Sequence, residues 1–390
     1  MKILVAHNRY QQRGGEDFVF ENELRLLASS GYDVHALVVS NETITSHVDK
    51  VFTMFRTVNN PVGTAAMAQA IQKFRPDLVH VHNFFPLLSP GIYAVCNNAG
   101  IPVVQSLHNF RPICANGLLM RAGNACHLCV RGSPLWGVRH RCYRHSLAGS
   151  VATARMIAVH RRRRTWSTAV DRYIVSSEFG RSVFIEAGFP VQRIDVKPNF
   201  MEDPGEPDEN VPRNGVFYSG RLSPEKGVRY LVEACVRHGF SLRIAGDGSE
   251  LAALRKIASS NVAFLGNIPP VAVFKEMRRA AVVAIPSICY EQFPMAILNA
   301  FACATPIIVS RIGALPEIVE DGVTGFHFPP ADSVALAERI RQAVRDPAGC
   351  RRLGSAGRRT FLERYTPEVN LKLLNDIYKR ALDRDGSSRP

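Results

Sequence analysis

The sequence contains no apolar run that approaches the roughly 20 residues a helix needs to cross a membrane. Its apolar N-terminal run, Met1 to Ala6, carries one lysine, ends at the polar residues His7 to Arg9, and is too short for the apolar region of a secretion signal. We therefore predict that this run is a buried first strand and that the protein is cytoplasmic. In such a reducing compartment, clustered cysteines more often bind metal than form disulfides.

Two further signals are absent, namely the low apolar content of disordered chains and an internal repeat of solenoid length. Apolar residues make up 46% and charged residues 21% of the 390 residues, as in an ordinary soluble globular protein. One hydrophobic core rarely organises more than about 300 residues, so this length predicts two domains.

Aspartate and glutamate are missing from residues 111 to 164, a segment that contains many of the arginines. The formal net charge of the chain is +14, and most of the excess positive charge is therefore local. A localised basic surface indicates an anionic partner, such as phospholipid headgroups, nucleic acid or a phosphorylated substrate.

Short β-branched runs alternate with segments of helical periodicity along the chain. The first strand is followed by a helix from Phe18 to Leu27, a stop at Gly31 and a strand at Val34–Val39. Later strands are expected at 78–81, 103–107, 173–175, 216–218, 242–245, 262–265, 282–285 and 307–309. Later helices are expected from about Glu225 and at 335–344, 351–364 and 369–382. This alternation predicts an α/β protein whose parallel sheets are covered by helices on both faces.

An acidic, turn-rich segment without apolar residues, Glu202–Asn210, lies near the middle of the chain. We assign residues 1–198 to an N-terminal Rossmann-like domain, with an insertion rich in cysteine and arginine at 111–164. Residues 199–365 form a second Rossmann-like domain. The C-terminal helix, 366–382, is expected to rejoin the first domain, and 386–390 to form a loose tail.

The loops that follow the strands contain the distinctive residues, and ligands of open parallel sheets bind beyond the carboxyl ends of the strands. After the first strand, Gly14 and Gly15 open a helix, where bare backbone N–H groups can face a phosphate. After the strand near 217, Arg221 and Lys226 lie at a helix start, where two cations can neutralise a diphosphate leaving group without a metal. Taken alone, the glycine pair also suits a flexible turn, and the two cations also suit a solvated surface.

A carboxylate, Glu291, precedes a helix that begins around Phe293-Pro294-Met295. Proline in the first turn leaves free N–H groups at the positive end of the helix, and the acid can accept hydrogen bonds from sugar hydroxyls. Asn299 lies two turns further on. An acid at a helix start is also common for structural reasons alone.

In their order and spacing, these motifs resemble those of the family-four glycosyltransferases, which have the GT-B fold of two Rossmann-like, doubly wound domains facing a cleft. The resemblance extends over nearly the whole chain. It rests on Gly14-Gly15-Glu16, Val79–Asn83, Ser106–Asn109, Ser176–Phe179, Lys197–Asn199, Ser219–Arg221, Lys226-Gly227, Ala245–Gly248, Tyr290–Pro294, Thr305–Ser310, Gly313, Leu315–Glu317 and Asp321–Gly325.

The resemblance implies a hexosyltransferase that moves a sugar from a UDP- or GDP-sugar, with retention and without a catalytic metal or other cofactor. The implied acceptor is a glycan or a lipid-linked molecule in cell-envelope or exopolysaccharide biosynthesis. Arg221 and Lys226 would hold the donor diphosphate, Glu291 would bind the donor sugar, and the glycine turn would face the phosphates from the other domain. The full donor-binding set implied beside them is Gly14, Gly15, Gly220, Asp247, Phe293, Pro294, Met295 and Asn299.

His108 matches the active-site histidine of the family, and a ring N–H is expected to bond a sugar hydroxyl. Without the other motifs, a buried structural histidine would be the better interpretation. His80 and His82 alternate along an expected strand, so one of them is expected to face the core. The mechanism implied by the resemblance is front-face displacement, in which the acceptor attacks from the side that the nucleotide leaves and a phosphate oxygen takes its proton.

The sequence departs from the family pattern at Asn299. The family has glutamates at both ends of an eight-residue step, whereas here Glu291 is followed by Asn299. An asparagine amide can accept one ribose hydroxyl and donate to another, so we expect altered nucleotide binding rather than an inactive enzyme. An inactive homologue, a GT-B-type epimerase of the nucleotide sugar and a zinc-dependent nucleic-acid-binding protein remain as alternatives.

Four cysteines lie in the insertion after the His108 loop, namely Cys114, Cys126, Cys129 and Cys142. Cys126 and Cys129 have the C-x2-C spacing with which two thiolates bind one metal, and one cysteine flanks them on each side. This pattern predicts a structural zinc site with His127 and His140 as reserve ligands. An iron–sulfur cluster, a disulfide pair and unligated thiols also fit the spacing.

The segment Leu147–His160, which four arginines follow, is the candidate membrane contact. It suits an interfacial helix whose basic end meets anionic lipid on the inner face of the plasma membrane, which would make the protein a peripheral membrane protein. It equally suits a helix that packs on its own domain with its arginines in water.

Overall fold

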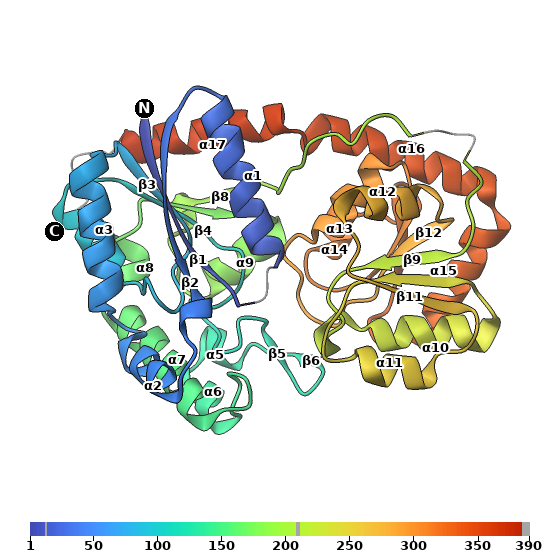
Figure 1. Ribbon diagram of the computed structural model, residues 1–390, viewed down its shortest axis with the longest axis horizontal. Helices are drawn as coiled ribbons and strands as arrows, with labels where there is room; N and C mark the ends of the chain where they lie inside the picture. The colour runs from blue at the N-terminus through green and yellow to red at the C-terminus, as the bar shows by residue number, and fades with distance from the viewer. Residues whose placement is uncertain (12–13, 208–210, 384–390) are drawn as a thin grey trace. The chain divides into compact units, whose positions relative to one another are not determined.

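A six-stranded parallel sheet lies at the centre of each half of the chain in the computed structural model, which describes residues 1–11, 14–207 and 211–383. Contacts divide the chain into two units (Figure 1). The first unit comprises Met1–Leu119, Cys126–Pro198 and the segment from Asn370, and the second comprises Met120–Ala125 and Asn199–Val369. The predicted tail at 386–390 and the end of the acidic segment, 208–210, lie outside the described residues.

The first sheet has the strand order β2-β1-β3-β4-β7-β8, and all neighbouring strands are parallel. Its strands are β1 (Lys2–Arg9), β2 (Asp33–Ser40), β3 (Leu78–Asn83), β4 (Val103–Ser106), β7 (Arg172–Val175) and β8 (Ile194–Val196). The direction of winding reverses between β1 and β3, and ligands of such sheets bind at this reversal, beyond the carboxyl ends of the strands. The glycine turn follows β1 at this place.

Helices α1 (Gly15–Ser29) and α17 (Pro367–Leu382) cover one face of the first sheet. Phe20 of α1 and Leu374 of α17 belong to one buried cluster with strand residues such as Val5. From Asn370 onward α17 belongs to the first unit, although it follows the second unit in the chain. The other helices of this unit are α2 (His47–Arg56), α3 (Pro61–Phe74), α4 (Ile92–Asn98), α5 (Leu128–Arg131), α6 (Leu135–Arg139), α7 (Leu147–Arg162), α8 (Thr165–Thr168) and α9 (Glu178–Glu186), with the 3-10 turns η1 (Asn41–Thr43) and η2 (Val191–Arg193).

The second sheet has the order β11-β10-β9-β12-β13-β14 and is also parallel throughout. Its strands are β9 (Val216–Ser219), β10 (Leu242–Ala245), β11 (Val262–Gly266), β12 (Val282–Ile285), β13 (Ile307–Ser310) and β14 (Gly325–Phe328). Figure 1 shows helices α10 (Val228–His238) and α11 (Leu251–Ile257) below these strands and α12 (Pro270–Arg278) and α13 (Met295–Ala302) above them. The unit also contains α14 (Leu315–Ile318), α15 (Ser333–Arg345), α16 (Pro347–Arg364) and the 3-10 turn η3 (Pro224–Lys226).

The helix expected from about Glu225 begins later than predicted. Pro224–Lys226 forms the 3-10 turn η3, Gly227 takes a φ of +63°, and α10 starts at Val228. Lys226 therefore lies at the end of this 3-10 turn instead of on the helix α10. The antiparallel hairpin of β5 (Met120–Arg121) and β6 (Asn124–Ala125) was not predicted either. No helix in the described part of the chain is long and apolar enough to cross a membrane.

Candidate active site

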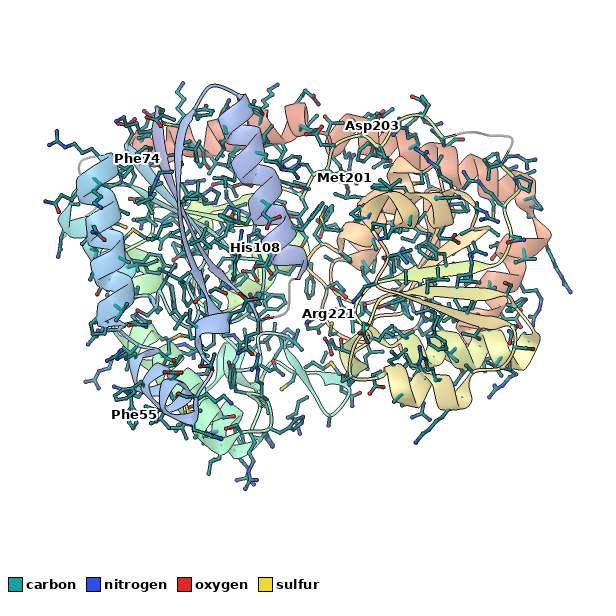
Figure 2. The ribbon with its side chains drawn as sticks, viewed as in Figure 1. Phe55, Phe74, His108, Met201, Asp203 and Arg221 are labelled. Carbon is teal, nitrogen blue, oxygen red and sulfur yellow. The ribbon has the colours of Figure 1, made fainter. Side chains whose placement is uncertain are left out.

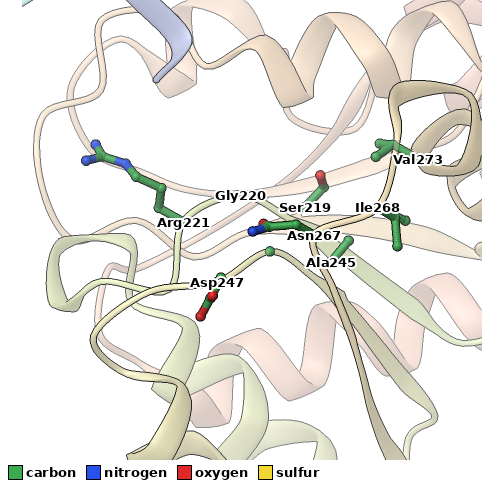
Figure 3. Close-up of a pocket in the computed structure, with 9 residues that line it drawn as sticks. Ser219, Gly220, Arg221, Ala245, Asp247, Asn267, Ile268 and Val273 are labelled. Atoms are coloured by element: carbon green, nitrogen blue, oxygen red, sulfur yellow. The ribbon is translucent and has the colours of Figure 1, made fainter. Parts of the chain in front are cut away.

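A pocket of about 180 Å³ lies in the second unit, where β9, β10 and β11 end (Figure 3). Its lining residues are Ser219, Gly220, Arg221, Ala245, Gly246, Asp247, Asn267, Ile268 and Val273. Gly246 has a φ of +135°, and a Cβ on it would lie 1.9 Å from the Gly220 carbonyl oxygen. Only glycine therefore lets these two loops approach closely at the floor of the pocket. Gly220 and Asp247, both expected in the donor-binding set, are lining residues.

Arg221 is held through its backbone, while its guanidinium remains accessible. The Tyr218 hydroxyl donates a hydrogen bond to the Arg221 carbonyl oxygen at 2.8 Å. The Arg221 side chain is 57% exposed, and the nearest carboxylate oxygen with which it pairs, on Glu225, is 4.0 Å away. Figure 3 shows the side chain extending away from the other lining residues. Such a cation is available to an anionic ligand.

Lys226 and Glu291, predicted as separate ligand contacts, form an ion pair. Lys226 Nζ donates to Glu291 Oε1 at 2.6 Å, and the Ser287 hydroxyl donates to the same oxygen at 2.7 Å. Gly227 makes this pairing possible, because a Cβ on it would lie 2.0 Å from the Pro286 carbonyl oxygen. The loop that carries Lys226 is thereby packed against the loop that carries Glu291. Among the described residues, Glu291 Oε2 has no hydrogen-bond partner.

Attraction within this pair outweighs the effect of burial. Burial by itself would raise the pKa of the Glu291 carboxyl and lower the pKa of the Lys226 ammonium. The charge of the partner and the hydrogen bonds reverse both shifts, so that the pKa of Glu291 lies below its ordinary value and that of Lys226 above it. Both groups are therefore charged at neutral pH.

The helix after Glu291 begins as the proline predicts. Pro294 is the N-cap of α13, which starts at Met295 and contains Asn299. Phe293 is buried, and its ring packs edge-on against Tyr365 with 5.4 Å between the ring centroids. The Phe293 side chain thus contributes to packing, whereas Met295 and Asn299 are partly exposed.

The glycine turn lies in the first unit and is held by Asp17. Asp17 Oδ2 accepts a hydrogen bond from the Gly14 backbone N–H at 2.9 Å, and Asp17 Oδ1 lies 2.8 Å from Nε2 of the buried His7. A Cβ on Gly14 or Gly15 would meet no heavy atom within 4 Å. Packing against the described residues therefore does not require glycine at these two positions.

A protonatable carboxyl follows this turn and contacts the His108 loop. Glu16 Oε2 accepts hydrogen bonds from the Tyr10 hydroxyl at 2.9 Å and from Asn109 Nδ2 at 3.1 Å. Burial raises the pKa of Glu16 to about 7. The sequence singled out Glu16 only as part of a motif, because burial depends on the distant loop at Asn109.

His108 is partly buried in the first unit (Figure 2), and its neighbour Asn109 bonds Glu16 in the first turn of α1. His108 Nε2 is 3.0 Å from His82 Nδ1, and the two rings are stacked with 5.1 Å between their centroids. The expectation that only one of His80 and His82 faces the core is wrong, because residues two apart in a strand share a face and both are buried. Both approach Glu23 Oε1, at 3.1 Å from His80 Nδ1 and 3.2 Å from His82 Nε2.

Two family models match the chain in succession. The Glycosyltransferase Family 4 model matches residues 13–203, and the model described as Glycosyl transferases group 1 matches residues 199–360. The chain is a family-four, group 1 glycosyltransferase. Its two parallel-sheet units have the GT-B fold of solved glycosyltransferases.

Two solved structures illustrate the shared fold. Sucrose-phosphate synthase from Thermosynechococcus elongatus is 18% identical to the glycosyltransferase with a TM-score of 0.72, covering 97% of this chain and 98% of that chain. HepE from Anabaena, in complex with UDP-glucose, is 20% identical with a TM-score of 0.67, covering 97% of this chain and 100% of that chain.

Two curated relatives come from Mycobacterium tuberculosis. Glycogen synthase is 34% identical over 192 residues, covering 46% of this chain and 46% of that protein. Alpha-maltose-1-phosphate synthase is 29% identical over 192 residues, covering 45% of this chain and 49% of that protein. The glycosyltransferase thus spans about half the length of the curated relatives it matches.

The four cysteines of the insertion lie near one another in the glycosyltransferase. Burial first, and then the neighbouring thiols of Cys114, Cys142 and Cys126, raise the pKa of Cys129 to about 12. None of the nine cysteines forms a disulfide. Among the described residues, the only three potential ligand atoms within 4.8 Å of one another belong to Glu23, His80 and His82, so the four sulfurs do not converge this closely.

The predicted membrane helix packs on the protein, and a neighbouring helix exposes apolar side chains instead. Helix α7 buries residues along its length, among them Ala154, Met156 and Ile157. Helix α2, which packs against α7, has no buried residue. It exposes Val48, Val51, Phe52 and Phe55, which we call the α2 face. Exposed apolar residues continue onto α6 with Leu135 and Trp136 and onto α7 with Leu147 and Val151.

The buried histidine makes the first unit of the glycosyltransferase sensitive to acid. Burial lowers the pKa of His82 from 6.5 to about 4 in the folded protein. The unfolded chain therefore gains a proton below pH 6.5 that the folded chain does not, and stability is lost as the pH falls from 6.5 towards 4. This shift corresponds to about 3 kcal/mol of unfolding free energy. The pKa of Glu23 is lowered too, because Lys197 and the histidines outweigh burial, which adds a loss below pH 4.5.

Urea unfolding at pH 7 and pH 4.5 measures this loss. Both tryptophans, Trp136 and Trp166, lie in the first unit, so their fluorescence reports its unfolding. We expect the midpoint of the wild type to fall relative to that of His82→Asn, which cannot be protonated, as the pH is lowered from 7 to 4.5. The raised pKa of Glu16 stabilises the folded state over the same pH range and is present in both proteins. An equal shift of the midpoint between the two pH values in the wild type and in His82→Asn would therefore contradict the assignment.

Proposed function

We propose that the chain transfers a hexosyl group from a UDP-sugar to an acceptor hydroxyl, with retention of configuration and without a catalytic metal. The observation that carries this proposal is the charged arrangement at the strand ends of the second unit. Arg221 and Lys226 supply two cations, and Glu291 supplies a carboxylate that is held by Lys226 and Ser287. HepE in complex with UDP-glucose supports a uridine nucleotide in a protein of this fold.

The two cations and the carboxylate have different roles in binding the donor and in stabilising the leaving group. Arg221 and Lys226 bind the diphosphate and neutralise the negative charge that grows on it as the bond between the anomeric carbon and the phosphate oxygen breaks. Glu291 Oε2 accepts hydrogen bonds from hydroxyls of the donor sugar, which orients its anomeric carbon. The acceptor oxygen forms the new bond on the face that the nucleotide leaves, and its proton passes to a phosphate oxygen. No protein nucleophile takes part, so orientation and electrostatics supply the acceleration.

A screen of nucleotide sugars that reads nucleotide release, with and without added acceptors, tests this function. We expect release of UDP that depends on an acceptor and is unchanged in EDTA, because the two cations take the place of a divalent metal. Conversion of the donor without any acceptor would identify an epimerase instead, and a requirement for added magnesium or manganese would contradict the metal-independent mechanism.

We further propose that the acceptor is lipid-linked or close to a membrane, as in envelope or exopolysaccharide assembly. The α2 face is apolar and exposed. Helix α2 itself packs against α7, which ends in a run of arginines. Arg155 and Arg162 of α7 are exposed, as is Arg139 of α6. Apolar side chains flanked by cations match the interface of an anionic membrane, which takes up the apolar groups and attracts the charges.

Vesicle flotation tests the membrane contact. We expect recovery with anionic vesicles to exceed recovery with neutral vesicles and to fall at least about threefold in Phe52→Ser/Phe55→Ser, because about 0.6 kcal/mol or more of apolar transfer energy is lost. Val271→Ser is the matched control, since Val271 is 80% exposed on α12 of the second unit. Equal recovery with both vesicle types would overturn the membrane contact.

We also propose that Cys114, Cys126, Cys129 and Cys142 bind a structural zinc ion. The support is the C-x2-C spacing and the mutual proximity of the four thiols. The Gly137 backbone lowers the pKa of Cys129 and so opposes part of the rise that burial causes, which favours a thiolate. Rotation of the thiols about their Cα–Cβ bonds must bring the sulfurs together around the ion, whose role is to hold the arginine-rich insertion in shape.

Elemental analysis of protein purified without a metal-affinity tag tests the zinc site. We expect about one equivalent of zinc in the wild type and a loss of zinc with a lower melting temperature in Cys126→Ser. Cys235→Ser, in the core of the second unit, should keep its zinc. Less than about a tenth of an equivalent of zinc or iron, with unchanged melting of Cys126→Ser, would remove this proposal.

A further inference from the structure

A chain of titratable side chains leads from the interior of the first unit to His108. Lys197 Nζ donates to Glu23 Oε2 at 2.8 Å, and Glu23 Oε1 lies 3.2 Å from His82 Nε2. His82 Nδ1 in turn lies 3.0 Å from His108 Nε2. Lys197, Glu23 and His82 are buried, and His108 is partly exposed. These four side chains come from α1, from β3, from the loop after β4 and from the residue that follows β8.

The positions of the protons along this chain follow from the chemistry of its first members. Lys197 can only donate, and Glu23 is ionised, because Lys197 and the two histidines outweigh burial and lower its pKa. Both Glu23 oxygens are therefore acceptors. The contact between Glu23 Oε1 and His82 Nε2 is not aligned as a hydrogen bond, but a lone pair of His82 facing the carboxylate would be repelled. His82 therefore carries its proton on Nε2.

The same reasoning extends to His108. His82 is neutral, since burial lowers its pKa to about 4, so its Nδ1 carries a lone pair. His108 Nε2 faces this lone pair and therefore carries a hydrogen, which it donates to His82. Burial and the neighbouring His82 also hold the pKa of His108 well below its ordinary value, so its ring is neutral and Nδ1 is left with a lone pair. Within the described residues, no side chain or backbone group binds His108 Nδ1.

We propose that Glu23 and His82 are positioning residues that fix His108 in its Nε2–H tautomer, so that Nδ1 accepts a hydrogen bond from a hydroxyl of the bound sugar or acceptor. The direction is the reverse of the one expected from the sequence, where a ring N–H was to donate to the hydroxyl. The nature of the ligand rests on the proposed transferase function, whereas the tautomer itself does not.

A metal ion is the competing explanation for this cluster. Glu23, His80 and His82 each offer a ligand atom within 4.8 Å of the others, and Glu23 Oε1 lies 3.1 Å from His80 Nδ1 and 3.2 Å from His82 Nε2, close enough to share one ion. Two contacts argue against a metal ion at this place. The Lys197 ammonium pairs with the same carboxylate, and the Tyr378 hydroxyl lies 2.7 Å from His80 Nδ1, on the atom that would bind the metal. The first contact places a fixed positive charge beside the carboxylate, and the second occupies the His80 nitrogen, so both disfavour a cation although Glu23 Oε1 and His82 Nε2 have no hydrogen-bond partner in the part of the protein that the structure describes.

Nitrogen-15 NMR of protein labelled in its histidines reads the tautomer directly and needs no substrate. The His108 signals are assigned by their loss in His108→Asn. We expect the Nε2–H pattern at pH 7.5 in the wild type. An Nδ1–H or doubly protonated His108 in the wild type would overturn the proposal, and so would metal that is present in the wild type, kept in Cys126→Ser and lost in His82→Asn.

Two amide substitutions of His82 separate positioning from simple packing. In His82→Asn the amide occupies the place of Nδ1 and its oxygen can still accept from His108, whereas in His82→Gln it occupies the place of Nε2 and leaves His108 without an acceptor. We expect the wild-type tautomer and turnover within about threefold in the asparagine variant. In the glutamine variant we expect mixed tautomers and a fall in kcat of about tenfold, the effect of one lost hydrogen bond, with little change in KM. An unchanged His108 tautomer in both variants would overturn the proposal.

Glu23→Gln gives the sharpest test. Lys197 can only donate, so it holds the amide oxygen on its own side and leaves the amide NH2 facing His82. His82 must then accept at Nε2 and carry its proton on Nδ1, which forces His108 into the Nδ1–H tautomer. We expect this inversion in the spectrum of a folded variant. Retention of the wild-type tautomer would contradict the proposal that Glu23 and His82 set the tautomer of His108. If the wild type shows the Nε2–H tautomer and Glu23→Gln inverts it, but the protein transfers no sugar, the positioning role of Glu23 and His82 is supported and the proposed function is wrong.

Discussion

Lys226→Ala and Arg221→Ala are each expected to lower turnover at least about tenfold, which corresponds to about 1.4 kcal/mol or more of transition-state stabilisation. Each change removes one of the two cations that face the diphosphate in the proposed mechanism. The effect should appear in kcat, because the negative charge that these cations stabilise grows as the nucleotide leaves. Steady-state kinetics on the true donor measure it.

Arg229→Ala is the matched control for these variants. Arg229 also lies in the second unit, close in sequence to Lys226, but it pairs with Glu233 on the surface of α10. We expect wild-type kinetics in this variant. Because the Arg221 side chain is 57% exposed, Arg221→Ala should also keep the wild-type melting temperature, so that a loss of rate cannot come from unfolding. Wild-type rates in both Lys226→Ala and Arg221→Ala would refute the diphosphate assignment.

Lys197→Met is expected to destabilise the first unit by about 3 to 5 kcal/mol, because it leaves a buried carboxylate without its cation. Lys197 Nζ donates to Glu23 at 2.8 Å and to Asn370 Oδ1 at 3.0 Å, and all three residues are buried. The ammonium thus joins α1 to the part of α17 that returns to this unit. Urea unfolding followed by tryptophan fluorescence measures the change in the first unit alone, since it contains both tryptophans.

The double variant Glu23→Gln/Lys197→Met separates the effect of the unpaired charge from that of lost packing. It removes both charges, so we expect it to be more stable than Lys197→Met alone. A double variant as unstable as the single one would show that the loss comes from the missing lysine side chain and its packing. In that case, the charge of Glu23 would not be the cause.

The loops of the second unit illustrate how much of the site the sequence predicts. Gly220, Arg221 and Asp247 follow strands whose β-branched residues are apparent from their period, and ligands of parallel sheets bind at these ends. The pairing of Lys226 with Glu291 was not predicted. It depends on the break at Gly227, where the close approach of Pro286 places the two loops together.

In the basic insertion, the sequence did not predict which surface is exposed. The spacing of apolar residues in Leu147–His160 is compatible with a membrane surface or with the protein interior, and tertiary packing selects the interior for much of α7. Helix α2 buries no residue and leaves the four apolar residues of the α2 face exposed, while α7 exposes only some of its apolar residues, such as Leu147 and Val151. Which of two amphipathic helices is covered depends on what packs against each, and a local pattern does not contain that information.

The family, the two parallel sheets and the loops that contain Gly14, Arg221 and Glu291 were all predicted, because they follow from periodicity and from motifs within short segments. That Glu23, His82 and Lys197 surround one buried site behind His108 became apparent only from the folded chain. Glu23 is buried on α1 among apolar residues such as Phe20 and Leu27, and a carboxylate at such a position is a local sign of such a site. Its partners lie far away in the sequence, and a buried charge is stable only where folding brings donors to it, so the packing of these segments sets the proton positions.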